Sequence, residues 1–487
     1  MDRRTKIVAT LGPASSDQAV IERLIKAGMD VVRLNFSHGS HEEHEARINI
    51  LRDLCQEANH PITLLQDLQG PKIRTGNIES DSVILDQGQS LVLTTKKILG
   101  NKKKISVDYA DLPHSVKPGG RILLDDGNLE LVVVSIEEDQ IDTKVVLGGE
   151  LKSHKGVNLP GATLNIPAFT DKDEADLKFG IEHQIDAVAM SFVRSAPDVQ
   201  KVRQAIERLA PDRRRIPIIA KLEKPEALNN LNEIVRAADG VMVARGDLGV
   251  EMSPQAVPIA QKKIIEVANK HAKLVITATQ MLDSMIHNPR PTRAEASDVA
   301  NAIFDGSDGV MLSGETAVGK YPVQSVEMMA AIICNAEAQL SKWGHWDGNL
   351  SEVISDEIAA GDVTHDDALS ITRAARELAD DRNVAAIAVF TQTGRTAELM
   401  AKARPRAPVL AFTPEKSTYF QLPMLWGVIP HLVPFANTLE DMLKVVEETI
   451  VSATSIQPGQ QVVLISGFPV GAMCPPNLAL LHTIEKR

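Results

Sequence analysis

Aromatic side chains and positive charge are both scarce in this chain. Phe, Trp and Tyr together make up 3% of the 487 residues, too few to build the stacking platforms on which proteins bind single-stranded nucleic acid. The formal net charge is −12, and a negatively charged surface repels phosphate backbones. Nucleic acid is therefore not an expected partner, and any anionic small substrate must meet a local basic pocket.

Cysteine is rare, and long apolar runs are missing. The three cysteines, Cys55, Cys334 and Cys474, lie far apart and share no metal-ligand spacing, so we expect reduced thiols in a cytoplasmic protein. No apolar run approaches the length of a membrane span, and residues 1–4 lead straight into a strand-like segment without the pattern of a signal peptide. The sequence therefore predicts no membrane partner.

A repeated unit of apolar strand and amphipathic helix dominates what is present. Each unit begins with a short Val- and Ile-rich run that ends in polar residues or glycine, and a helical pattern follows. Such strands are typical of a parallel sheet covered on both faces, and eight units predict a closed (β/α)8 TIM barrel. Gly28 as a helix stop, and Thr292 with Glu295 as a capping box, support the helices. The eight runs are residues 6–12, 30–39, 62–70, 186–194, 216–224, 240–249, 274–282 and 309–316.

Two further regions depart from this repeat. The segment after the third strand holds short alternating stretches at 83–86, 90–95, 121–126 and 142–147, which are typical of a small antiparallel β domain. Inserted at the rim of a barrel, such a domain would act as a lid that excludes water. The last part of the chain resumes strand–helix alternation as an open α/β domain. The expected domains are the barrel at 1–71 and 168–342, the inserted lid at 72–167, a linker with a short helix at 343–365, and the C-terminal domain at 366–487.

Two carboxylates stand at the ends of neighbouring strands. Glu223 follows one apolar run and Asp247 follows the next, so both are expected at the carboxyl-terminal face where barrels keep their chemistry. Two carboxylates with few other protein ligands suit Mg²⁺, and Lys221 adds a point positive charge beside them. A metal flanked by cations is what phosphoryl transfer needs. Either acid alone would more often be a surface or salt-bridge residue, but the pair with basic neighbours favours a metal site.

The second and third strands also end in polar clusters. Arg33 could grip a phosphate, and Asn35 and Ser37 offer oxygen ligands on the same face of an extended segment. After the third strand, Lys72 and Arg74 alternate onto one face and could meet phosphates. Polar residues commonly end strands, so the alternative for both clusters is ordinary solvated side chains.

Hydroxyl groups gather at two further places. Thr277 and Thr279 end the seventh strand, where they could hydrogen-bond a bound acid or serve only as helix caps. In the last domain, residues 391–396 follow a strand and open a helix with hydroxyls and a glycine, which predicts a phosphate cradle or, with equal weight, a plain N-cap. No Walker lysine pattern is present, so this loop is not a nucleotide P-loop.

Taken together, these motifs resemble the pyruvate kinase family over essentially the full length of the chain. The resemblance implies a catalytic barrel, an inserted lid and a C-terminal effector domain, usually in a homotetramer. It implies transfer of a phosphoryl group from phosphoenolpyruvate to ADP, giving pyruvate and ATP, at the end of glycolysis. The motifs are GPAS (12–15), RLNFSHG (33–39), KGVNLPG (155–161), KLEKPEAL (221–228), MVARGDLGVE (242–251), ATQMLDSM (278–285), RPTRAEASDVANA (290–302) and LSGETAVGKYP (312–322).

The resemblance also assigns roles at the barrel rim. Glu223 and Asp247 are expected to hold Mg²⁺ or Mn²⁺, which bridges the substrate carboxylate and phosphate. Lys221 is expected to stabilise charge on the transferring phosphoryl group and on the enolate oxygen, and Arg33 to grip the phosphate. Fixed cations suit a metaphosphate-like species between two anions better than a base does.

Further roles follow from the same resemblance. The backbone of Gly246 and the hydroxyl of Thr279 are expected to position the substrate carboxylate, and Thr279 lies on the side expected to protonate the enolate through water. Asn35, Arg74 and Lys155 are the expected nucleotide contacts, with Lys155 reaching in from the lid.

One departure from the family concerns its monovalent cation. Many members bind K⁺ through Asn, Ser, Asp and a Thr carbonyl, with a Glu in the adjacent turn. Asn35, Ser37 and Asp67 are present here, but Leu68 stands at the Thr position and Lys72 at the Glu position. Because a lysine ammonium can replace a monovalent ion, we expect a vestigial site with Lys72 as the internal cation and no need for K⁺.

The loop at 391–396 resembles the effector phosphate site of the family. A sugar phosphate or a nucleoside monophosphate is therefore an expected activator. Residues 471–477 depart from the pattern common in bacterial members, which leaves the identity of the effector open. The expected effector residues are Thr391, Thr393, Gly394, Arg395 and Thr396.

Two other readings of the motifs remain. A barrel lyase or aldolase could use Mg²⁺–enolate chemistry on a pyruvate-like acid, but it would need no lid lysine such as Lys155 to clamp a nucleotide. A metabolite sensor without catalysis would be expected to have lost Lys221 or a metal ligand, and the chain retains all of them.

Overall fold

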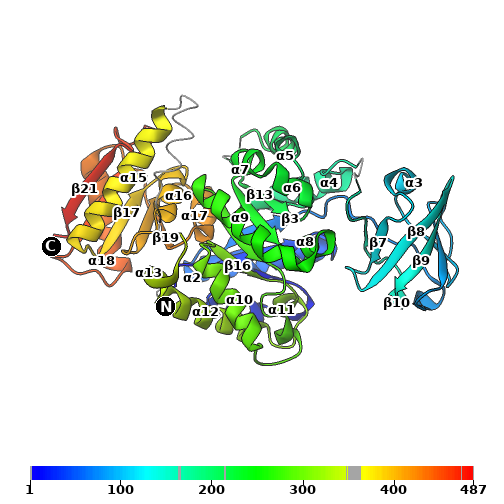
Figure 1. The fold of residues 1–487 in the computed structure, drawn as a ribbon. Helices are drawn as coiled ribbons and strands as arrows, with labels where there is room; N and C mark the ends of the chain where they lie inside the picture. Colours follow the sequence, from blue (N-terminus) through cyan, green and yellow to red (C-terminus); the bar gives the residue numbers. More distant parts are fainter. Residues whose placement is uncertain are drawn as a thin grey trace.

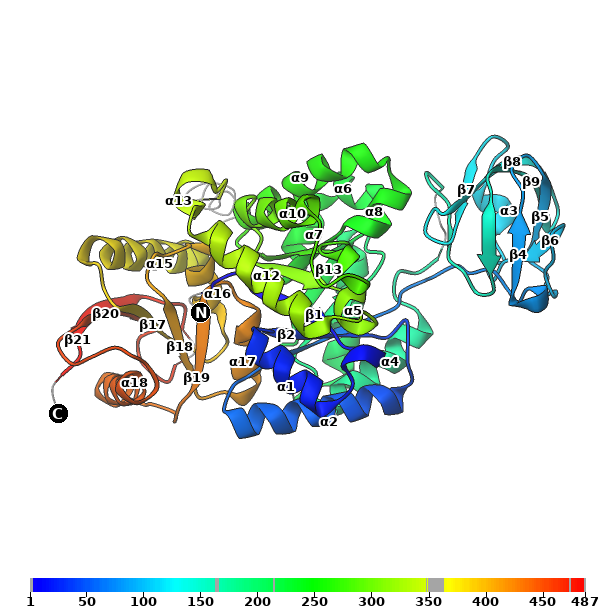
Figure 2. The ribbon, with the colours of Figure 1, turned by 90° about the horizontal axis from the view of Figure 1, so that it is seen from below.

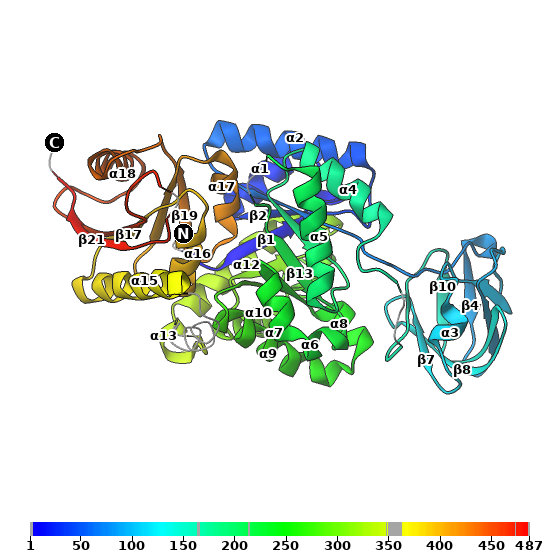
Figure 3. The ribbon, with the colours of Figure 1, turned by 90° about the horizontal axis from the view of Figure 1, so that it is seen from above.

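The computed structural model places three bodies in a row, with the barrel in the middle (Figure 1). The C-terminal domain and the inserted domain lie at opposite ends of the barrel in all three views (Figure 2, Figure 3). The structure describes residues 3–162, 166–212, 215–346, 348, 363–472 and 474–485, without the side chains of 363–366. Most of the expected linker, 347 and 349–362, lies outside this range.

Eight parallel strands close into a barrel, in the order β1-β16-β15-β14-β13-β12-β3-β2. Nearly every strand residue is buried, because side chains of one face fill the barrel and those of the other pack under the helices. The predicted TIM barrel is thus confirmed, each strand falling within one of the eight predicted runs. The strands are β1 Lys6–Thr10, β2 Val31–Asn35, β3 Thr63–Asp67, β12 Ala187–Met190, β13 Ile218–Leu222, β14 Gly240–Ala244, β15 Leu274–Ala278 and β16 Gly309–Leu312.

Helices cover the outside of the barrel, and their ends carry the expected signals. Gly28 ends α1 with a φ of 110°, a left-handed conformation that favours glycine. Thr292 and Glu295 form the capping box of α10. The principal helices of this layer are α1 Gln18–Ala27, α2 His41–Ala58, α4 Asp171–Glu182, α5 Ala196–Leu209, α6 Pro225–Asn229, α7 Leu231–Ala237, α8 Arg245–Glu251, α9 Val257–Lys270, α10 Arg293–Phe304, α11 Gly314–Ala317, α12 Pro322–Glu337 and α13 Leu340–Trp343.

The inserted domain is built from mostly antiparallel strands around its own apolar core, and only β5 and β6 pair in parallel among its described strands. Six strands form one sheet in the order β11-β7-β8-β9-β5-β6, and β10 pairs with β4. The four predicted stretches overlap β4, β5, β7 and β9, whereas the longest strand, β8, was not predicted. The elements are β4 Ser82–Leu85, β5 Ser90–Thr94, β6 Lys104–Ser106, α3 Leu112–Ser115, β7 Arg121–Leu124, β8 Leu129–Glu137, β9 Gln140–Leu147, β10 Gly149–Lys152 and β11 Val157–Asn158.

The C-terminal domain is an open five-stranded sheet in the order β19-β18-β17-β20-β21. Four strands are parallel, and β21 adds an antiparallel edge that the sequence analysis did not predict. The loop 391–396 joins β17 to α16, as expected. The elements are α15 Val363–Arg382, β17 Ala386–Phe390, α16 Arg395–Lys402, β18 Val409–Thr413, α17 Lys416–Gln421, β19 Val428–Leu432, α18 Leu439–Ala453, β20 Gln461–Ser466 and β21 Leu478–Thr483.

Candidate active site

A buried lysine links the ends of two barrel strands. Lys221 Nζ, near the end of β13, lies 2.8 Å from Glu223 Oε1 and 3.2 Å from Asp67 Oδ1 at the end of β3. It also donates a hydrogen bond of 2.7 Å to Ser191 Oγ. Asp67 Oδ2 in turn accepts a 2.6 Å hydrogen bond from Nε of Arg33. The fold therefore brings four of the residues selected from the sequence into one network of alternating charge.

This network fixes the charge of its members. Burial acts to lower the pKa of Lys221, but the surrounding carboxylates of Asp67, Glu223 and Asp247 outweigh it, and the pKa is raised. Burial acts in the opposite sense on Asp67, and there Lys221 and Arg33 outweigh it, so that the pKa of Asp67 is lowered. Lys221 is therefore a permanent cation at neutral pH and cannot serve as a general base.

Glu223 and Asp247 form the candidate metal site. Burial raises the pKa of Glu223, the Lys221 ammonium opposes this shift, and the neighbouring carboxylate of Asp247 adds to it. The carboxylate of Asp247 has no hydrogen bond or ion pair among the described residues, and it lines a small cavity beneath the inserted domain. Hard oxygen donors that repel each other fit a divalent cation such as Mg²⁺.

The donor set is small. No group of three or more His, Cys, Asp and Glu side chains gathers as a metal cluster anywhere in the described part of the chain. Both carboxylate oxygens of Glu223 already have a partner. Oε1 accepts from Lys221, and Oε2 accepts from the Phe192 amide at 3.0 Å. A cation held here would therefore complete its coordination with water and substrate oxygens.

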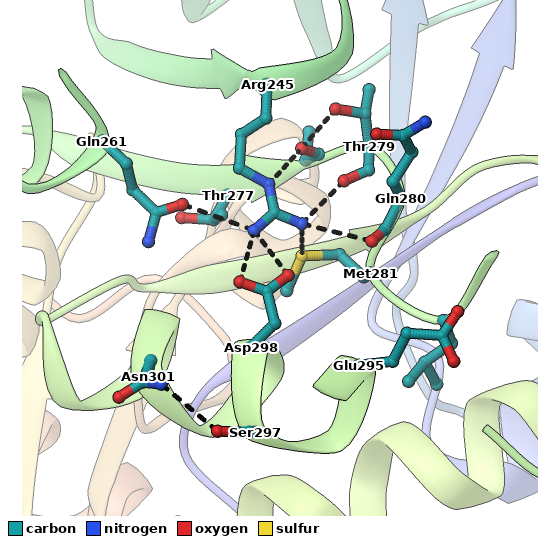
Figure 4. Close-up of polar contacts among 12 residues, drawn as sticks. Arg245, Gln261, Thr277, Thr279, Gln280, Met281, Glu295, Ser297, Asp298 and Asn301 are labelled. Carbon is teal, nitrogen blue, oxygen red and sulfur yellow. Dashed lines mark hydrogen bonds and ion pairs between the residues drawn. The ribbon is translucent and has the colours of Figure 1, made fainter. Parts of the chain in front are cut away.

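Arg245 holds the loop that carries Thr279 (Figure 4). Its guanidinium donates hydrogen bonds to the carbonyl oxygens of Ala278 at 3.2 Å and Thr279 at 2.7 Å. Asp298 on α10 accepts two hydrogen bonds from Arg245 Nη1, at 2.6 and 2.7 Å. Thr279 has a φ of 69°, a left-handed conformation that is strained for a β-branched residue, so the loop needs this external support.

Gly246 and Thr279 meet at the same rim. The Gly246 amide donates a 2.7 Å hydrogen bond to Thr279 Oγ1, and that hydroxyl donates to the Ala278 carbonyl at 2.6 Å. The amide lies in the first turn of α8, which also contains Asp247. An amide and a hydroxyl beside the metal-site carboxylate are suited to bind a substrate carboxylate.

The two connections to the inserted domain pair with each other and carry the predicted basic residues. Arg74 and Gly156 form an isolated antiparallel β-bridge, and the Thr75 amide donates a hydrogen bond to the Lys155 carbonyl at 2.8 Å. The Lys155 ammonium lies 2.8 Å from Asp125 Oδ1. Lys72 lines the cavity that contains Asp247. The structure thus brings the basic residues of both connections close together above the rim.

The inserted domain also contacts the barrel directly. Asn158 Nδ2 donates a 2.9 Å hydrogen bond to Glu251 Oε1 on α8, and the same carboxylate oxygen accepts from Lys224 at 2.5 Å. This contact lies four residues along α8 from Asp247. This contact therefore links the inserted domain to the helix that carries Asp247 of the candidate metal site.

The group predicted as a vestigial cation site is spread around the end of β2. Asn35 Oδ1 accepts a 3.1 Å hydrogen bond from the Ser37 amide, while both oxygens of Asp67 are taken by Arg33 and Lys221. Lys72 makes no ion pair among the described residues. The positive charge of Lys72 nonetheless acts on this loop. The pKa of His38 is lowered, first by burial and then by the charges of Lys72, Arg74 and Arg33.

The loop 391–396 lines a separate cavity of about 280 Å³ in the C-terminal domain. The Gly394 amide donates to Thr391 Oγ1 at 3.0 Å, and Gly394 has a φ of 85°. Thr393, Arg395 and Thr396 line the same cavity. Residues 471 and 472, in the segment that departs from the family pattern, form part of the opposite wall.

Three parts of this site were not found from the sequence. Ser191, which orients Lys221, and the pairs Arg245–Asp298 and Lys224–Glu251 join segments that are at least 27 positions apart. From the sequence, Arg245 is only a basic residue two positions before Asp247. Its role could not be predicted from spacing, because three of its six partner residues accept through backbone carbonyls and all of them are distant in sequence.

Comparison with known proteins gives a consistent result. A family model described as "Pyruvate kinase, barrel domain" matches residues 2–326, and "Pyruvate kinase, alpha/beta domain" matches 369–482. A pyruvate kinase of Geobacillus stearothermophilus is 46% identical over 489 residues, covering 100% of this chain and 81% of that protein. A pyruvate kinase of Corynebacterium glutamicum is 42% identical over 487 residues, covering 99% of this chain and 98% of that protein. Among the described helices, none is long and apolar enough to span a membrane.

Proposed function

This chain belongs to the pyruvate kinase family, and we propose that it transfers the phosphoryl group of phosphoenolpyruvate to ADP in the last step of glycolysis, as an ATP:pyruvate 2-O-phosphotransferase. The observation that carries this proposal is the buried ammonium of Lys221 between Asp67 and Glu223, with a pKa raised above its ordinary value. A fixed positive charge is what the migrating phosphoryl group requires.

Lys221 and Arg33 act as electrostatic groups. Lys221 stabilises the phosphoryl group during transfer and then the enolate oxygen that the transfer leaves behind. Arg33 holds the phosphate, with its own guanidinium oriented by Asp67 at 2.6 Å and Thr10 at 3.1 Å. Both cations are aligned before substrate arrives, so little reorganisation accompanies the reaction.

A divalent cation, Mg²⁺ or Mn²⁺, completes the site. Glu223 and Asp247 would hold it, and when bound it neutralises the substrate carboxylate and phosphate. The Gly246 amide and the Thr279 hydroxyl bind the substrate carboxylate in place of their present mutual hydrogen bond. Thr279 then orients a water that relays a proton from the solvent to the enolate carbon.

The nucleotide is bound between rim and lid. Asn35, Arg74 and Lys155 contact its phosphates, and closure of the inserted domain brings Lys155 inward while excluding water. The hydrogen bond between Asn158 and Glu251 supports a coupling of lid closure to α8.

Potassium is not required in this proposal. Lys72 supplies the positive charge that K⁺ supplies in many relatives, beside Asn35, Ser37 and Asp67. Its electrostatic effect on His38 supports a position near the end of β2. A phosphorylated effector binds the cavity at 391–396, and the protein works as a cytoplasmic homotetramer.

The test is a pyruvate-release assay with ADP in tetramethylammonium buffer, free of Na⁺ and K⁺. We expect full turnover with Mg²⁺ or Mn²⁺, less than a twofold gain on adding K⁺, and a K⁺ requirement in Lys72→Glu. Strong K⁺ activation of the unmodified enzyme would refute the role of Lys72. Absence of ADP-dependent pyruvate release under every condition would refute the kinase itself.

A further inference from the structure

A cavity of about 660 Å³ lies where the barrel meets the C-terminal domain, at the end of the barrel opposite the active site. Figure 2 shows the N-terminus, α13, α15 and α16 gathered in this region. Four arginines line the cavity, and they come from three separate parts of the chain. They are Arg4, Arg376, Arg404 and Arg406.

Arg404 carries a buried donor that has no partner within the described part of the chain. Its side chain is 9% exposed, and Nη2 donates to the Gly306 carbonyl at 2.9 Å and to Asp308 Oδ1 at 2.8 Å. Its other terminal nitrogen, Nη1, is buried without a hydrogen bond. Because a buried N–H of a charged group is costly to leave unpaired, this nitrogen indicates an acceptor that none of the described residues provides.

The rest of the lining adds positive charge that is not neutralised. Arg406 is exposed, and its guanidinium makes no hydrogen bond or ion pair with any described residue. Arg4 is held by the carbonyls of Pro405, at 3.0 Å, and Arg406. The one acidic residue among the lining side chains, Glu337, accepts its hydrogen bonds from the backbone amides of Arg4 and Thr5.

A basic cavity is unusual in a chain of net charge −12. Neighbouring acids do little to balance it, since Asp308 is shared between Arg404 and Lys402, and Asp380 approaches Arg376 only to 3.9 Å. Stacking of the Arg404 guanidinium on Trp426, at 4.3 Å from the ring centre, fixes the direction of its fork. An oriented fork with a free nitrogen matches the oxygens of a phosphate group.

We propose that this cavity binds a small phosphate ester, with Arg404 Nη1 and the Arg406 guanidinium on the phosphate. The site is distinct from the loop at 391–396. That loop runs into the first turn of α16, whereas Arg404 and Arg406 follow the last residue of this helix, whose eight residues span about 12 Å. Because both domains contribute to the lining, a bound ligand stabilises their contact.

The tryptophans make this proposal directly measurable. The chain has three, Trp343, Trp346 and Trp426. Two of them line the cavity, and Trp343 lies on α13 beside it. Intrinsic fluorescence therefore reports on this region alone, in the full-length protein and without substrates, so the result is independent of whether the proposed kinase reaction occurs.

The experiment titrates the protein with inorganic phosphate and with glycerol 3-phosphate, using glycerol as the uncharged control. We expect a saturable fluorescence change with both anions and none with glycerol. Arg406→Gln is expected to weaken binding about tenfold or more, the effect of losing one charge-assisted hydrogen bond. The matched control is Arg373→Gln, an exposed arginine of α15 outside the cavity, for which binding is unchanged.

A second variant separates this site from the effector loop. The double change Thr391→Ala and Thr393→Ala removes hydroxyls of the loop at 391–396 and is expected to leave the fluorescence titration unaltered. Loss of the signal in that variant would place the anion at the loop and overturn the proposal. Equal binding by Arg406→Gln and the unmodified protein, or no saturable change with either phosphate, would overturn it as well.

Discussion

A buried lysine lies at each end of the barrel, and the pKa values of these two lysines are shifted in opposite directions. Lys221 stands near the carboxyl end of β13, and Lys402, the last residue of α16, reaches Asp308 just before the amino end of β16. Their side chains are 10% and 4% exposed. Yet the pKa of Lys221 is raised, and burial lowers the pKa of Lys402 to about 8.

The difference lies in the number of carboxylates rather than in burial. At the rim, Asp67, Glu223 and Asp247 outnumber Lys221 and Arg33. At the other end, two cations, Lys402 and Arg404, share the carboxylate of Asp308, and Glu337 adds a weaker attraction on Arg404.

Carboxylates therefore outnumber cations around Lys221, whereas Lys402 and Arg404 share one carboxylate as their ion-pair partner. The first arrangement favours a bound cation and the second a bound anion. The proposed metal site and the proposed phosphate-ester site thus differ in the balance of charge around them.

The largest expected effect comes from removing the rim lysine. Lys221→Met leaves the transferring phosphoryl group without its nearest fixed cation, so we expect kcat for pyruvate release to fall about 10³-fold. Lys402→Met, an equally buried change at the other end, is expected to lower kcat less than about threefold. Similar losses in both variants would show that the two ends are not functionally distinct.

Next in size is the removal of the carboxylate that Lys402 and Arg404 share. Asp308→Asn leaves these two buried cations without their common ion-pair partner, so we expect about 3 kcal/mol less stability to unfolding, measured by denaturant titration. Asp380→Asn, which affects the more exposed pair with Arg376 and a 3.4 Å hydrogen bond from the Arg406 amide, is the control and is expected to cost less than about 1 kcal/mol. Equal losses of stability in the two variants would contradict the explanation from the number of carboxylates.

A smaller effect is expected from the support of the Thr279 loop. Arg245→Lys keeps the charge near Asp298 but loses the fork that binds the carbonyls of Ala278 and Thr279. Because misplacement of a substrate contact weakens catalysis, we expect kcat/KM for phosphoenolpyruvate to fall about tenfold to a hundredfold. The melting temperature serves as the control, since a purely structural role would lower stability without a selective effect on kcat/KM.

Sequence patterns predicted the barrel because its strands are local, apolar and regularly spaced. Two of the strands that escaped prediction, β8 and β21, are antiparallel and only partly buried, so their composition differs less from that of loops. Lys221 and Glu223 could be selected because strand direction places them together.

Long-range contacts could not be predicted in the same way. Asp298 meets Arg245 across 53 positions, and Arg4 reaches the carbonyl of Pro405 across 401. No periodicity in the sequence indicates such pairs. The arginine cavity is lined by residues from segments that are far apart in the chain. The site was therefore predictable where it follows strand ends, and hidden where tertiary packing alone assembles it.

The smallest expected effect is a pH dependence that separates the two lysines. The folded pKa of Lys402, about 8, lies below its ordinary value of 10.5. Between these values the unfolded chain holds a proton that the folded chain has released, so the free energy of unfolding rises with pH, by at most about 1.4 kcal/mol per unit. Measured from pH 8 to 10, the unmodified protein should gain stability relative to Lys402→Met. The raised pKa of Lys221 acts with the opposite sign and only above pH 10.5, so a flat or falling difference between the two proteins would contradict the contrast between the barrel ends.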